Sequence, residues 1–136
     1  MVKTDLIIVG GKRKTSIAKA HIKDGHGIIT INKVPYTNFH NFHKLSIDEP
    51  IRIAKNILGE IKYDIHVKVT GGGNESRIEA VRLAIARALV KKSKSEKLKK
   101  AMGEYDKYLL VADTRRKEAY KPGDSKARSK RQKSYR

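Results

Sequence analysis

The sequence predicts an α+β fold, a two-layer sandwich in which a small, mostly antiparallel or mixed sheet carries helices on one face. Two observations predict the sandwich. In the first half of the chain apolar and polar residues alternate, as in strands with one solvent-exposed face, and in the second half apolar residues recur with a helical period. A third predicts an extended basic C-terminal tail, because no Ile, Leu, Val, Phe or Met follows Val111. We therefore divide the 136 residues into one globular domain, 1–114, and a tail, 115–136.

The strand predictions in the first half rest on apolar runs and turn residues. Residues 6–9 form an apolar run, and we expect the following Gly10-Gly11 to break that strand. From residue 16 to 23 small or apolar side chains alternate with polar ones, the period of a half-buried strand. The Asp-Gly-His-Gly sequence at 24–27 is typical of a turn, and residues 28–32 continue extended, which predicts a hairpin.

A first helix and one further strand are predicted in the middle of the chain. Asp48-Glu49-Pro50 places two acids and a proline where a helix N-terminus favours them, so we expect the helix to open there. Gly59 is a suitable C-cap for it. Residues 63–69 alternate more regularly than any other segment and predict a strand with one wet face.

The remaining predicted elements are two helices and a short apolar segment that packs back into the core. A long helix over about 75–92 has a core stripe every three or four residues, formed by Ile78, Val81, Ile85 and Leu89. A shorter helix over about 96–102 follows, with Ser95 as its expected N-cap. The segment 108–111 is apolar enough to return to the core.

Composition excludes several functional classes. The chain has no Cys, which excludes disulfides, thiolate metal sites and a Cys nucleophile, and no apolar run approaches the ~20 residues of a membrane span. We expect a soluble, intracellular protein without a membrane partner. The formal charge is +18, and the tail carries ten basic residues against two acidic ones. A polyanion is therefore the expected partner.

A glycine triplet at 71–73, between the alternating strand and the long helix, is the most motif-like feature. Tight backbone packing or an RNA phosphate contact explains it; a nucleotide cofactor is the less favoured reading, because the strand before it alternates rather than being buried on both faces. His40 and His43 have no third ligand at helpful spacing, so we expect no metal and no cofactor.

Basic residues outside the tail also suit nucleic acid. Lys12-Arg13-Lys14 enters a strand whose outer positions include Lys19 and Lys23, and no acid interrupts this strip. After Ser125, Lys or Arg recurs at nearly every other position, as expected of an extended segment that follows a phosphate backbone. Tyr120 and Tyr135 could stack on bases.

These motifs resemble the S-nine family of small-subunit ribosomal proteins. The similar segments are 11–18 (Gly-Lys-Arg-Lys-Thr-Ser-Ile-Ala), 31–35 (Ile-Asn-Lys-Val-Pro), the glycine triplet with the helix at 80–89, and 115–118 with 131–136. The final Gln-Lys-Ser-Tyr-Arg resembles the archaeal and eukaryotic branch. The resemblance covers nearly the whole chain in the family's order, with two departures: Ser76-Arg77-Ile78 after the triplet, and less glycine near the tail's hinge.

The resemblance implies a structural constituent of the small ribosomal subunit, cytoplasmic and without catalytic residues. Its implied partners are ribosomal RNA of the subunit head, P-site transfer RNA and neighbouring ribosomal proteins of the head. The residues expected to contact ribosomal RNA are Lys12, Arg13, Lys14, Lys19, Gly71, Gly72, Gly73, Arg77, Arg115, Arg116, Lys117, Lys121, Lys126, Arg128, Lys130 and Arg131. Those expected at transfer RNA are Lys133, Ser134, Tyr135 and Arg136.

The alternative function from another class is a small nucleotide-binding phosphotransferase that uses the turn at Gly71–Gly73. A general nucleic-acid compactor is a third possibility. Binding of free nucleotide would distinguish the first alternative from a ribosomal protein, and a lack of preference for folded ribosomal RNA over random duplex would distinguish the second.

Overall fold

The computed structural model describes residues 6–120 and 135–136. A five-stranded sheet has the order β1-β2-β5-β3-β4. Its strands are β1 (Ile7–Arg13), β2 (Ser16–Asp24), β3 (Ile29–Ile31), β4 (Val34–Pro35) and β5 (Tyr63–Thr70). All neighbouring pairs are antiparallel except β3 and β5, which run parallel. The sheet is therefore mixed, and the α+β prediction is confirmed.

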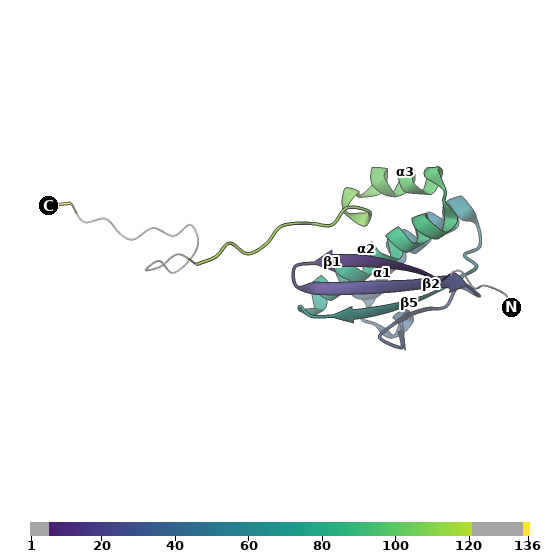
Figure 1. Ribbon diagram of the computed structural model, residues 1–136, viewed down its shortest axis with the longest axis horizontal. Helices are drawn as coiled ribbons and strands as arrows, with labels where there is room; N and C mark the ends of the chain where they lie inside the picture. The colour runs from purple at the N-terminus through teal and green to yellow at the C-terminus, as the bar shows by residue number, and fades with distance from the viewer. Residues whose placement is uncertain (1–5, 121–134) are drawn as a thin grey trace.

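Three α-helices complete the domain: α1 (Asn41–Leu58), α2 (Asn74–Ser93) and α3 (Glu96–Tyr105). Helix α2 packs on β1, β2 and β5, while α1 and α3 pack on each other and on α2. In Figure 1 the strands β1, β2 and β5 face the viewer and the helices lie behind and above them. Helices thus cover one face of the sheet and leave the other open.

The core lies between α2 and the covered face. Alternate residues of the central strands point into it, among them Ala18, Ala20 and Ile22 of β2. The predicted stripe of α2 is buried as well, at Ile78, Val81, Ile85 and Leu89. Leu109, in the short 3-10 turn Lys107–Leu109, is fully buried, which confirms the predicted apolar return.

The predicted break of the first strand at Gly10-Gly11 is wrong, because β1 runs on to Arg13. Helix α2 explains why a glycine stands within the strand. A Cβ on Gly11 would lie 2.3 Å from the carbonyl oxygen of Ala80 and 2.8 Å from the amide nitrogen of Ala84. The absent side chain at Gly11 allows the backbones of β1 and α2 to approach closely.

The predicted hairpin of the second and third strands is also wrong. Strand β5 lies between β2 and β3, antiparallel to one and parallel to the other. Asp64, at the start of β5, accepts the backbone N–H of His26 at 2.8 Å and of Ile28 at 3.0 Å. These bonds hold the 24–28 turn against the start of β5, where the chain passes from β2 on one side of β5 to β3 on the other.

Helix α1 begins at Asn41 rather than at Asp48, and Pro50 lies inside it. Pro50 is buried along the same side as Ile47, Ile51 and Ala54. This packing outweighs the usual preference for proline in the first turn. The other ends agree with the predictions: Gly59 caps α1 with φ +78°, and the Ser95 hydroxyl accepts the Leu98 N–H at the start of α3.

Candidate nucleic-acid interface

The predicted basic strip divides between the two faces of the sheet. Lys12 and Lys19 stand at outward positions of β1 and β2 and are exposed. Lys14 is exposed in the β1–β2 turn, where its φ is +51°. Arg13 points to the helix side instead, where its Nε lies 2.5 Å from Glu79 Oε2. Lys12, Lys14 and Lys19 are therefore available to an external anion, whereas Arg13 is already engaged within the domain.

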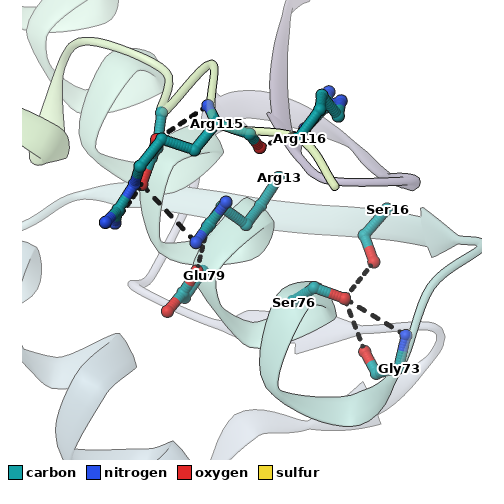
Figure 2. A network of polar contacts seen from close by, with 8 residues as sticks. Arg13, Ser16, Gly73, Ser76, Glu79, Arg115 and Arg116 are labelled. Atoms are coloured by element: carbon teal, nitrogen blue, oxygen red, sulfur yellow. Dashed lines mark hydrogen bonds and ion pairs between the residues drawn. The ribbon is translucent and has the colours of Figure 1, made fainter. Parts of the chain in front are cut away.

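Arg13 belongs to a network that holds the start of the tail against the domain (Figure 2). Asp113 lies 3.5 Å from Arg13 Nη2 and 2.6 Å from Arg115 Nη2, and its side chain is 9% exposed. The hydrogen bonds from the Arg115 side chain, followed by the Arg115 backbone N–H, hold the pKa of Asp113 well below its usual range. Arg115 has its own pKa raised by the same pair. The carboxylate is thus ionised at neutral pH and bridges β1 to the tail.

A second anchor lies just before this network. Arg87 of α2 donates from Nε to the Leu110 carbonyl at 2.8 Å and from Nη1 to the Gly10 carbonyl at 3.0 Å. One guanidinium therefore joins the edge strand to the segment that leads into the tail. The sequence had given no sign that Arg87 differs from a solvated helix cation.

Arg82 has a similar internal role. Its Nη2 pairs with Glu49 of α1 and lies 3.0 Å from Asp106 Oδ2, at the end of α3. Three helices thus meet at one arginine. Like Arg87, it was not singled out as a structural residue from the sequence, because an arginine on a helix is by itself compatible with solvent, RNA or an ion pair.

Beyond Asp113, the described tail residues are exposed. Lys117 Nζ lies 2.8 Å from the Tyr120 hydroxyl and 4.5 Å from the centre of its ring. Arg116 donates to the Arg115 carbonyl at 3.4 Å. Tyr135 is 87% exposed. This part of the tail presents cations and aromatic rings to its surroundings.

The remaining tail predictions lie outside the described residues. They concern Lys121, Lys126, Arg128, Lys130, Arg131, Lys133 and Ser134. Arg136 is described and exposed.

The glycine triplet is built into the domain by tight packing. Gly71 and Gly72 have φ values of +75° and +65°, and a Cβ on Gly72 would lie 1.9 Å from the Ser16 hydroxyl. That hydroxyl lies 2.8 Å from the Ser76 hydroxyl and donates to the Gly71 carbonyl at 3.0 Å. Ser76 in turn accepts the Gly73 N–H at 3.1 Å (Figure 2).

The single hydroxyl proton of Ser76 has two acceptors within reach, Ser16 Oγ at 2.8 Å and the Gly73 carbonyl at 3.0 Å. Ser76 also accepts the Gly73 N–H, and the Ser16 hydroxyl donates to the Gly71 carbonyl. Arg77 Nε also donates to that carbonyl, at 2.8 Å. The turn therefore uses internal partners for these polar groups, as expected of a packing motif, and the departure at Ser76-Arg77 provides two of those partners.

Among residues 6–120 and 135–136, no three His, Cys, Asp or Glu side chains come together as a metal site would require. His43 instead lies 2.8 Å from Glu75. No helix in the described part of the chain is long and apolar enough to cross a membrane.

A family model and several known proteins are similar to this chain over nearly its whole length. The family model described as ribosomal protein S9/S16 matches residues 11–136. The chain is 44% identical to "Small ribosomal subunit protein uS9" of Desulfurococcus amylolyticus, over 98% of this chain and 95% of that protein. It is 43% identical to the protein of the same name from Thermoplasma volcanium, over 97% and 99%. It is 42% identical to the protein of the same name from Methanococcus vannielii, over 93% of this chain and 95% of that protein.

Proposed function

Because the chain belongs to the ribosomal protein S9/S16 family, we propose that it binds ribosomal RNA of the small-subunit head and contacts P-site transfer RNA with its tail. As a member of this family it is a structural, non-enzymatic protein of the cytoplasmic small ribosomal subunit. The phosphotransferase alternative is therefore wrong. The internally bonded glycine turn agrees with a packing role.

The anchored start of the tail is the observation that carries the proposal. Asp113 and Arg87 fix the segment before residue 115 to β1 and α2. From Arg115 onward the sequence contains ten basic residues, two acidic ones and no aliphatic core residue apart from alanine. The start of the tail is thus held against the domain, and the residues after it are basic and poor in apolar side chains. Such a segment is expected to bind RNA phosphates, which neutralise its charge.

The proposed assignment of contacts follows the chain outward. Exposed Lys12, Lys14 and Lys19 contact ribosomal RNA from the domain, together with Arg116 and Lys117 at the start of the tail. The basic residues from 121 to 131 continue along ribosomal RNA, and the last four residues, 133–136, reach transfer RNA. Arg13, Arg77 and Arg115 contribute chiefly by holding the turn and the tail in place.

Sedimentation of cell extract tests the ribosomal assignment directly. Extract is run on sucrose gradients at moderate and at high salt, with the tagged full-length protein detected by antibody. We expect the protein to travel with the small subunit and to remain there at high salt, because the folded domain and the basic tail both bind RNA. A protein that stays at the top of both gradients would contradict the proposal.

A further inference from the structure

The open face of the sheet carries more charge than the predicted strip alone. Outward positions alternate with core positions, and lysine occupies them on three neighbouring strands: Lys12 on β1, Lys19 on β2 and Lys68 on β5. Lys23 continues the β2 row. Residues at alternate strand positions lie ~6.6 Å apart, and neighbouring strands lie ~4.8 Å apart. Lys19 and Lys68 are the directly opposed pair of this set, whereas Lys12 stands opposite Ile17 and Lys23 opposite Asp64.

On this face, identical side chains stand directly opposite each other across β2 and β5. Lys19 and Lys68 are register partners across β2 and β5, and His21 and His66 form the next outward pair. Directly opposed like charges destabilise a sheet. Among the described residues no acidic side chain pairs with Lys19 or Lys68. A local rule of sheet stability is thus broken at an exposed position, where function is the usual reason.

The one acid in the register of this face is already occupied. Asp64 stands opposite Lys23, but its Oδ1 accepts the N–H groups of His26 and Ile28. The Ile28 bond is the largest cause that lowers the pKa of Asp64. Asp64 therefore holds the turn at the end of the sheet and leaves the Lys19–Lys68 pair without a counter-ion.

A shallow depression with a largely apolar surface lies beside the pair. It measures about 400 Å³ and is lined by residues that include His21, Thr30, Asn32, His66 and Lys68. The Thr30 hydroxyl lies 2.7 Å from His66 Nδ1. The Asn32 amide is also engaged, because its Nδ2 donates to the Val69 carbonyl at 3.2 Å and its Oδ1 accepts the Val69 N–H at 3.0 Å. The groups at this pair that remain for a phosphate are therefore the exposed ammonium groups of Lys19 and Lys68.

We propose that this open face is a second RNA-binding surface, in which Lys19 and Lys68 contact neighbouring phosphates of folded ribosomal RNA. The inference rests on the proposed function, which already places Lys19 at ribosomal RNA, and it adds Lys68 and the sheet face that the two lysines share. A protein partner fits less well, because the cores of protein interfaces are depleted in lysine and enriched in aromatic residues. The outward positions of β1, β2 and β5 carry lysine, histidine, threonine, isoleucine, one glycine and one aspartate, and none carries Phe, Tyr or Trp.

The test compares two full-length variants with the same charge change. Lys19→Gln with Lys68→Gln removes the pair; Lys97→Gln with Lys100→Gln removes two exposed lysines of α3 and is the control. Each protein is titrated with deproteinised small-subunit ribosomal RNA at several salt concentrations, with a random RNA duplex as competitor. Urea unfolding of the free proteins accompanies the titration.

For the sheet variant we expect at least a tenfold loss of affinity near 0.1 M salt. The slope of log K against log salt should fall in magnitude by about 1.4 to 1.8, the value for two lost phosphate contacts. The control should change severalfold less. The urea midpoint of the sheet variant should equal or exceed that of the wild type, because a repulsive pair has been removed.

Equal losses in the two variants would overturn the proposal, since general charge would then explain the binding. Retained RNA affinity, together with loss of a neighbouring protein from subunits assembled with the sheet variant, would also overturn it and assign the face to protein. Failure of the proposed function itself is distinct: the wild type would then show no preference for ribosomal RNA over random duplex.

Discussion

At the scale of single residues, the turn before α2 depends on a side chain that is absent. Gly72 adopts φ +65° and lies against the Ser16 hydroxyl, which is buried together with Ser76. Any Cβ there displaces a hydroxyl whose bonds join β2 to the start of α2. A left-handed backbone and a buried polar contact thus coincide at one position, and both oppose substitution.

Gly72→Ala should therefore lower the free energy of unfolding by about 2 kcal/mol or more, from backbone strain and the displaced hydroxyl. Gly73→Ala is the matched control, because Gly73 has φ −89° and no atom within 4 Å of an added Cβ. Urea unfolding of the two variants measures the difference. Equal stabilities would show that the turn is held by something other than this contact.

At the scale of elements, Asp113 ties the tail to the edge strand through Arg13 and Arg115. Its folded-state pKa is lowered, chiefly by the Arg115 side chain, below the unfolded value of about 3.9. The stabilisation is therefore present at all pH values above about 4, and it is lost only as pH falls through the folded-state value. Neutral and mildly acidic conditions should leave the anchor intact.

Asp113→Asn should weaken this anchor at neutral pH, where the wild-type carboxylate is ionised. Trypsin binds a free arginine side chain, so cleavage after Arg115 should become several-fold faster at pH 8. Glu60→Gln removes one exposed surface acid and should leave that rate unchanged. An unaltered rate in the Asp113 variant would show that Arg87 alone holds the segment.

The elements also show what periodicity can and cannot predict. The alternation in β5 and the stripe of α2 follow from burial of one face, and both were predicted closely from the sequence. Which strand lies beside which depends on distant contacts, so the placement of β5 between β2 and β3 was missed. Arginines were missed for a related reason: Arg82 and Arg87 differ from solvated cations only through partners from other elements.

At the scale of the whole molecule, the domain and the tail use charge in different ways. Inside the domain, guanidinium groups are engaged with carboxylates and carbonyls, as at Arg13, Arg82 and Arg87. Lysines such as Lys19 and Lys68 remain exposed on the open face, and the tail adds a net charge of +8. The basic residues that stabilise the fold are thus largely different from those available to bind RNA. Changes in the tail should therefore leave the fold intact.

Deletion of residues 132–136 should consequently weaken P-site transfer RNA binding while the protein still assembles into small subunits. The deletion removes Lys133 and Arg136, and the loss of two cation–phosphate contacts should reduce affinity about tenfold near 0.1 M salt. Filter binding of transfer RNA to reconstituted subunits measures the affinity, and gradient sedimentation measures assembly. Full-length Lys97→Gln with Lys100→Gln matches the loss of two cations on a distant helix and should bind transfer RNA normally. Unchanged affinity in the truncated subunits would contradict a tail that ends at transfer RNA and confine its role to ribosomal RNA.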